Sequence, residues 1–265
     1  MAEVQAFVLF EGLPLIDGRQ LVNDLGWRWP EVGNPQNLVR GEQEVGFALG
    51  EAAILMVNID APIDYADFPE RRVSDRFWPG SINGLMRHQS HMLISADLEN
   101  RRGTDLFELA TKVTASALAA APSALGVYWP ATPQLINRES FLERASSLPS
   151  LPLELWIDIT VGKGRDGSVT GSTSGLESFG LRELEMVDSP ESRDAARIRL
   201  TNLVSQMLRQ RRNLSHGVTL GYDHTWKVEV EVAPSQLGRT GDVSQIVFRA
   251  ATDQAIIEAS AQANA

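Results

Sequence analysis

The sequence predicts an α+β protein, in which strands and helices follow one another without strict alternation. Three observations support this class. Short apolar runs bounded by Gly, Pro or acidic residues recur along the chain and predict strands. Between them lie a few amphipathic stretches that begin with helix-capping residues. Hydrophobic residues make up 43% of the 265, enough for one large domain or two small ones.

The first hundred residues contain four predicted strands and two predicted helices. The strands are the apolar runs QAFVLF (5–10), EVGFALGE (44–51), AAILMVNID (52–60) and HMLISADL (91–98). Helices are expected over 17–27 and 81–89, because Asp17 and Ser81 can cap them. The segment 30–41 is rich in Pro, Asn and Gly and predicts a loop.

The rest of the chain predicts further strands and three helices. Thr104 opens a long helix that Pro122 ends. Asn137 is expected to cap a helix, and Ser189-Pro190 to begin one that extends to about Arg212, with Pro at its first position. The expected strands are ALGVYW (124–129), LPLELWIDITVG (151–162), one from about Ser168, GLRELEMVD (180–188), HGVTLGY (216–222), TWKVEVEVA (225–233) and QIVFRAA (245–251).

Both halves of the chain fit one order of elements: strand, helix, hairpin, helix, strand. This is the split β-α-β order of ferredoxin-like folds, and it predicts two such halves in tandem. The expected parts are an N-terminal α+β half (1–100), a bridging helix (101–123), a C-terminal α+β half (124–252) and a loose Ala-rich tail (253–265). One continuous mixed sheet covered by helices is the alternative.

The composition limits the partners and the location. With 24 Lys and Arg against 34 Asp and Glu, the net charge is −10. An acidic surface repels nucleic-acid phosphates and anionic lipids but attracts a basic protein, so no nucleic acid and no membrane is expected as a partner. Cysteine is absent, which excludes disulfides and thiol chemistry. The apolar run at the N-terminus is too short for a signal peptide, so a cytoplasmic location is expected.

Several segments together resemble one known family. They are AILMVNIDAPIDYADF, the run from Trp78 through HQSHMLIS, ALGVYWPATPQLINRESFLE, LPLELWID and STSGLESFGLRELEM. In matching order over roughly residues 5–230, they resemble the bacterial family called domain of unknown function 4261. The resemblance implies a shared fold and no particular reaction, because no activity is attached to that family.

Two histidines lie close together in RHQSHMLISA (87–96). His88 is expected in the last turn of a helix, where an imidazole can donate to exposed carbonyls, and His91 at the start of a strand. A zinc site would need further ligands. The candidates are His216, His224, Asp60, Asp64 and Asp67. No signature spacing links any of them to the pair, so we expect both histidines to bond neighbouring backbone, and we predict no metal.

Other motifs approach catalytic signatures without matching them. GSTSG (171–175) has Thr173 where a nucleophile elbow requires serine, so a glycine-rich bend with freedom at Gly175 and Gly180 is expected instead. VGKG lacks the residues of a phosphate-binding loop, and the Asp-rich NIDAPIDYADF lacks the spacing of a calcium loop. No catalytic residue and no cofactor is predicted.

Trp78 and Trp129 each precede a proline at the edge of a predicted element. Such positions can leave an indole half exposed as an anchor for a partner, although burial in the core is the commoner place for tryptophan. The predicted binding residues are therefore Trp78, His88, His91 and Trp129.

Three classes of function are consistent with these patterns. The favoured class is a cytosolic protein-binding protein without catalytic activity, most concretely an immunity-type protein that neutralises a basic toxin. The first alternative is a metal- or acid/base-dependent enzyme near His88 and His91, assisted by the Asp-rich loop and by Glu183 or Glu185. The second is a structural or assembly subunit that uses its sheet edges and tryptophans.

Overall fold

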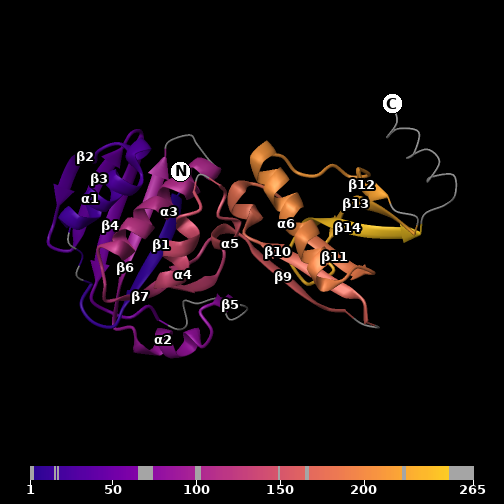
Figure 1. The fold of residues 1–265 in the computed structure, drawn as a ribbon, viewed down its shortest axis with the longest axis horizontal. Helices are drawn as coiled ribbons and strands as arrows, with labels where there is room; N and C mark the ends of the chain where they lie inside the picture. The colour runs from indigo at the N-terminus through magenta and orange to yellow at the C-terminus, as the bar shows by residue number, and fades with distance from the viewer. Residues whose placement is uncertain are drawn as a thin grey trace. The chain divides into compact units, whose positions relative to one another are not determined.

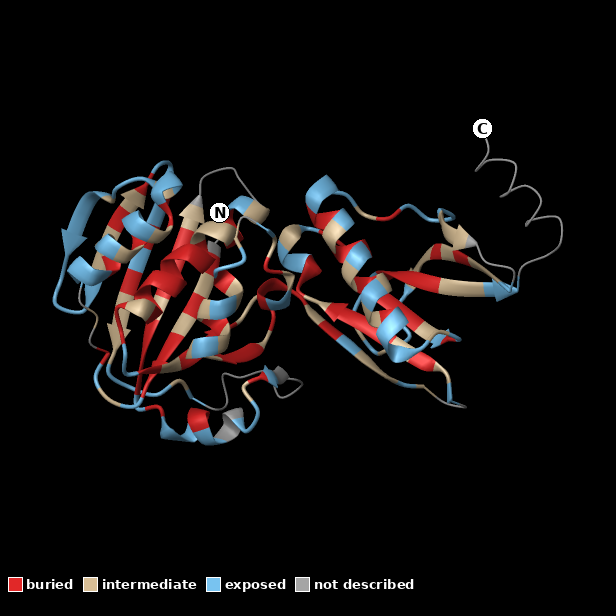
Figure 2. Ribbon diagram, viewed as in Figure 1, coloured by how far each residue is buried: buried red, intermediate tan, exposed pale blue. Residues whose placement is uncertain are grey.

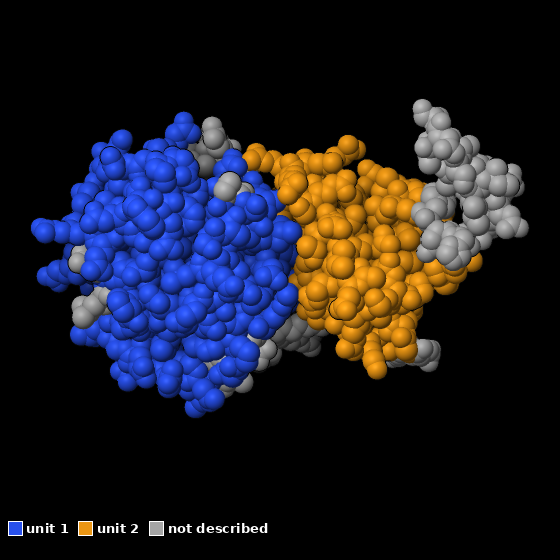
Figure 3. Space-filling model, in the orientation of Figure 1, with its two compact units in different colours: residues 1–158 blue, residues 159–265 orange. Residues whose placement is uncertain are grey.

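The computed structural model describes residues 3–14, 16, 18–64, 74–98, 103–148, 150–164, 167–222 and 225–250. The chain divides into two compact units, residues 1–158 and 159–265 (Figure 3). The described residues form fourteen strands in two sheets and six α-helices, which confirms the α+β class. The expected cap at Asp17 and the expected tail 253–265 lie outside the described residues.

Unit 1 contains an eight-stranded sheet and five helices (Figure 1). Its strands are β1 (Glu3–Phe10), β2 (Gln36–Arg40), β3 (Glu44–Leu49), β4 (Ala52–Ile59), β5 (Ser74–Phe77), β6 (Ser90–Leu98), β7 (Ala124–Trp129) and β8 (Gln134–Asn137). Its helices are α1 (Gly18–Arg28), α2 (Ser81–Arg87), α3 (Thr104–Ala119), α4 (Arg138–Ala145) and α5 (Leu153–Trp156). The spatial order is β2-β3-β4-β6-β1-β7-β8-β5, and every neighbouring pair except β8-β5 is antiparallel.

The centre of this sheet has the split β-α-β arrangement. The elements β1, α1, β4, β6, α3 and β7 occur in this order along the chain, with β2 and β3 inserted before β4 and β5 and α2 inserted before β6. In space the strands lie in the order β4-β6-β1-β7. The arrangement is completed by α3, which packs on β1 and β6, and by β7, which pairs with β1. The helix expected to bridge two halves over 101–123 thus belongs to unit 1. The sequence indicates that this helix exists, but not which sheet its apolar surface covers.

The core of unit 1 lies between the sheet and helices α1, α3 and α4. Buried positions recur along the central strands of this unit (Figure 2). Among them, Val8, Ile54 and Ile94 are almost completely buried against the helices. A smaller cluster of Leu9, Leu85, Tyr128 and Leu135 lies on the other face, where α2 covers part of the sheet. Fully burying a large apolar side chain contributes about 1.5–3 kcal/mol, so these layers stabilise the positions of the residues considered below.

Unit 2 contains a six-stranded sheet and one described α-helix. The elements are β9 (Asp158–Lys163), β10 (Val169–Ser174), β11 (Leu184–Ser189), α6 (Arg193–Gln210), β12 (Thr219–Tyr222), β13 (Trp226–Pro234) and β14 (Asp242–Ala250). Their spatial order is β12-β13-β14-β11-β10-β9, with β11 and β14 parallel and adjacent. A split β-α-β unit would have a strand between them, so the second half departs from the expected topology.

Some local boundaries also differ from expectation. Ser189 ends β11, and Ser192 caps α6 instead, its side chain accepting a hydrogen bond from Ala195 N at 3.2 Å. The expected strand 151–162 begins with the helical turn α5. The expected loop 30–41 contains β2, whose residues are all exposed, so pairing with β3 rather than apolar periodicity defines this strand.

Candidate functional site

His88 terminates α2 and bonds backbone on both sides of its ring. It is 6% exposed, and its Nδ1 donates to the carbonyl of Leu85. Its Nε2 accepts a hydrogen bond from the backbone N–H of Ile63 at 2.9 Å. Both ring nitrogens of His88 therefore have a backbone hydrogen-bond partner.

His91 lies three residues further on, in β6, and is 7% exposed. Its Nδ1 donates to the carbonyl of Ala61 at 2.8 Å, and its ring packs against Phe7 with centroids 5.8 Å apart. Burial lowers the pKa of His91 below its ordinary 6.5, the bond to Ala61 opposes this shift, and the neighbouring His88 adds to it. The neutral form is therefore favoured in the folded protein.

The two histidines together hold the segment that follows β4. Ala61 and Ile63 are both bonded by imidazoles, and Ile63 packs against the cluster beneath α2. This confirms the expectation that the pair bonds neighbouring backbone. Among the described residues, no three His, Asp or Glu side chains are grouped as metal ligands would be. Asp60 and Asp64 are exposed, whereas Asp67 and His224 lie outside the described residues.

The two predicted tryptophans have different surroundings. Trp78 is half-buried between glycines of two elements: a Cβ at Gly84 of α2 would lie 2.0 Å from its ring, and one at Gly126 of β7 would lie 2.6 Å from it. Trp129 is 0% exposed and packs on Phe107 and Phe141, so the expectation of a half-exposed anchor is wrong for it. Side chains alternate between the two faces along β7, and Trp129 lies on the face covered by helices. The proline that follows Trp129 in the sequence gives no information about which face this is.

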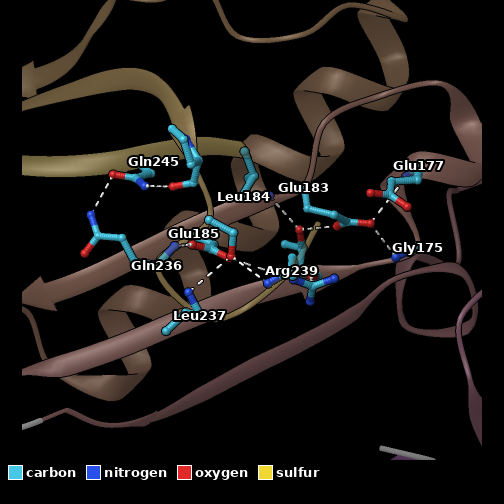
Figure 4. A network of polar contacts seen from close by, with 12 residues as sticks. Gly175, Glu177, Glu183, Leu184, Glu185, Gln236, Leu237, Arg239 and Gln245 are labelled. Atoms are coloured by element: carbon cyan, nitrogen blue, oxygen red, sulfur yellow. Dashed lines mark hydrogen bonds and ion pairs between the residues drawn. The ribbon is translucent and has the colours of Figure 1, made fainter. Parts of the chain in front are cut away.

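A buried polar network in unit 2 begins at Glu183 (Figure 4). This carboxylate is 2% exposed. It accepts hydrogen bonds from Thr173 Oγ1 at 2.6 Å, from Gly175 N at 2.8 Å and from Glu177 N at 3.3 Å. Thr173 Oγ1 accepts in turn from Leu184 N at 2.8 Å. The carboxylate thus supplies the acceptors for the bend after β10.

Glu185 does the same for a second loop. It is 0% exposed and accepts from the Ser235 hydroxyl and from Gln236 N at 2.9 Å. Arg239 lies with its Nε 3.9 Å from Glu185 and donates from its Nη2 to the carbonyl of Thr173, so one guanidinium joins both halves of the network (Figure 4). The charge of Arg239 offsets part of the cost of burying carboxylates.

The network is built to hold loops. Thr173 is bonded to Glu183 as a nucleophile would be to a base, but both are buried and the hydroxyl already accepts a backbone bond. Gly175 and Gly180 adopt φ angles of 117° and 72°, which confirms the expected glycine-rich bend. Sequence reasoning missed the role of Arg239. The available signal was the pair Glu183 and Glu185, two residues apart in the strand expected over 180–188.

Charge is unevenly divided between the units. Residues 1–158 contain 21 acidic and 12 basic side chains, a net charge of −9, whereas residues 159–265 contain 13 and 12, a net charge of −1. Four acidic residues of unit 1 form no ion pair with any described residue: Glu42, Glu44, Asp60 and Asp97. Three of them are exposed.

Comparison with known proteins found no matching family model, no matching curated protein and no matching solved structure. Within the described residues, every helix is too short or too polar to cross a lipid bilayer.

Proposed function

We propose that this chain is a protein-binding protein whose partner is basic, and that unit 1 makes the contact. The observation that carries the proposal is the concentration of negative charge on unit 1, −9 of the total −10. Glu42 and Glu44 are exposed and form no ion pair with a described residue, so no ion-paired cation offsets their charge. Such a field steers a basic partner and accelerates its encounter.

The surroundings of the reactive side chains also favour binding over catalysis. His88 and His91 are bonded to backbone groups, Glu183 accepts three hydrogen bonds and Glu185 accepts two. A catalytic base must reach a proton of the substrate. The two imidazoles and the two carboxylates are buried and already bonded to groups of the chain itself. Their bonds instead stabilise the loops of a rigid scaffold.

Within this class, we propose an immunity-type role in the cytoplasm, in which the chain neutralises a basic toxin. The acidic charge supports it, since fast association protects a cell that makes a toxin. We also propose that the chain belongs to the domain of unknown function 4261 family, because the segments quoted above resemble it. Co-expression tests the immunity role: a neighbouring toxin gene should be lethal alone and tolerated together with this chain.

The broader proposal is tested by association kinetics. The tagged full chain is used to capture partners from native lysate, and the captured protein is purified and mixed with the chain in a stopped-flow instrument. A basic partner is expected, with an association rate that falls at least tenfold between about 20 and 500 mM salt. The Glu42→Gln/Glu44→Gln double variant should associate more slowly, while Asp242→Asn in unit 2, also exposed, should not. An acidic partner or a salt-independent rate would contradict the proposal.

A further inference from the structure

The sheet of unit 1 has one face covered by helices and an opposite face that is covered only in part. Side chains of β3 and β4 alternate between the two faces, and residues paired across strands share a face. Phe47 and Ile54 are paired and buried on the helix side. Gly46 and Leu55, the next pair, therefore lie on the opposite side.

The opposite face exposes several apolar side chains. Near β7 and β8 it lies beneath α2 and Trp78. Toward β2, however, Val39 is 64% and Leu55 is 41% exposed, while Val57 and Leu93 are half-buried. We call this part of the sheet the open face. Its apolar residues are Val39, Gly46, Ala53, Leu55, Val57 and Leu93, and its acidic residues are Glu44 and Asp97.

The open face contains a notch that an apolar side chain would fill. Gly46 is paired with Val39 on one side and with Leu55 on the other, so it separates two exposed apolar side chains. A Cβ built at Gly46 would meet nothing closer than the Ile54 carbonyl oxygen at 3.9 Å, which means that there is space above the backbone.

The charged residues on the open face are acidic. Glu44 is paired with Val57 and Asp97 with Ala53, so both carboxylates share the face, and neither forms an ion pair with a described residue. Asp97 Oδ1 is inaccessible to solvent and has no hydrogen-bond partner among the described groups.

No described Lys or Arg of the paired strands points to the open face. In the described parts of β1, β2, β3, β4 and β6, Arg40 is the one Lys or Arg. Arg40 is paired with Val45, and Val45 is paired with Met56, which is buried on the helix side, so Arg40 shares that side. Its guanidinium lies near Gly18 of α1. The positive charge is therefore on the helix side of the sheet.

We infer that the open face is the docking surface for an amphipathic basic segment of the partner protein, with apolar side chains over Gly46 and Leu55 and Lys or Arg toward Glu44 and Asp97. The inference rests on the proposed function and names its surface. Charge complementarity selects this occupant. A second copy of the chain would bring the same carboxylates and a net charge of −9 against each other.

A defined peptide tests the surface without knowledge of the partner. The probe is a helical amphipathic peptide of Leu and Lys, and its control is the same peptide with Glu in place of Lys. In the isotope-labelled full chain, amide NMR shifts caused by the Leu/Lys peptide are expected at Val39, Leu55, Val57 and Leu93. Shifts that cluster elsewhere, or equal binding of the Leu/Glu peptide, would overturn the inference.

Matched substitutions provide the second measurement. Leu55→Lys and Val39→Lys should each weaken the Leu/Lys peptide at least tenfold, because each places a cation on the open face. Ile198→Lys is the control, since Ile198 is 61% exposed on α6 of unit 2, and it should change affinity less than twofold. Circular dichroism and thermal unfolding verify that each variant folds. Unchanged affinity in both folded open-face variants would refute the docking site.

Three outcomes separate this inference from the proposed function. If the captured partner binds with the expected salt dependence and Leu55→Lys leaves its Kd unchanged, the surface is wrong and the function stands. If sedimentation reveals a dimer that Leu55→Lys dissolves, the occupant is a second copy and the inference fails. If the captured partner is acidic, the proposed function fails first.

Discussion

Glu183→Ala should strongly destabilise unit 2. The substitution removes the acceptor for Thr173 Oγ1, Gly175 N and Glu177 N at 2.6, 2.8 and 3.3 Å. A hydrogen bond to a charged group contributes about 1.5–3 kcal/mol, and a buried donor left unpaired adds its desolvation cost. Because such contributions are not additive, we expect a loss of about 3–5 kcal/mol in the free energy of unfolding.

Hydrogen exchange at individual amides measures this loss in unit 2 alone. The amides of Gly175 and Leu184 should lose protection in Glu183→Ala, since both are bonded within the network. Glu183→Gln keeps one carbonyl oxygen and should lose only about 1–2 kcal/mol. Glu177→Ala is the control, because that side chain is exposed, and should change stability by less than about 0.5 kcal/mol. A loss below about 1 kcal/mol in Glu183→Ala would refute the structural role of the carboxylate.

Two other predictions concern unit 1. Gly126→Ala places a Cβ 2.4 Å from the Ile136 carbonyl oxygen, so it should lower the free energy of unfolding, measured by thermal unfolding, by about 1–3 kcal/mol. The control is Gly46→Ala, whose Cβ would have its nearest contact at 3.9 Å and should not destabilise the protein. Equal melting temperatures for the two would contradict the packing. His91 should make stability depend on pH: its folded pKa lies below 6.5, so the unfolded chain binds more protons between the two values. The contribution of His91 to stability should therefore be full above pH 6.5, fall as the pH decreases to the folded pKa and then level off. The substitution His91→Gln should remove this dependence on pH. An unchanged dependence in the variant would exclude His91 as its source.

Local features of the fold were predictable because neighbouring residues specify them. Asn137 caps α4 through a bond from Ser140 N at 2.7 Å, as a capping residue before a helical pattern predicts. The tight connection between β3 and β4 contains Gly50 at φ 60°, a conformation that glycine adopts readily. The bond from His88 to the Leu85 carbonyl followed from its expected place in the last turn of a helix.

Features that depend on distant residues were not predictable. Glu185 is bonded by residues about fifty positions away, which no spacing in the sequence links to it. Trp129 is buried because β7 lies in the middle of a sheet covered by helices. All side chains of β2 are exposed, and the segment is a strand because its backbone pairs with that of β3.

The sequence by itself determined the α+β class, most of the strands and helices, the acidic charge and the conformations required at bends, since all of these depend on composition or on residues a few positions apart. The tertiary structure decided which strands are neighbours, which sheet α3 covers, which glutamates are buried and which part of a sheet face stays exposed. The physical reason is that burial and pairing are contributed by segments far apart in the chain, and local propensity does not contain that information.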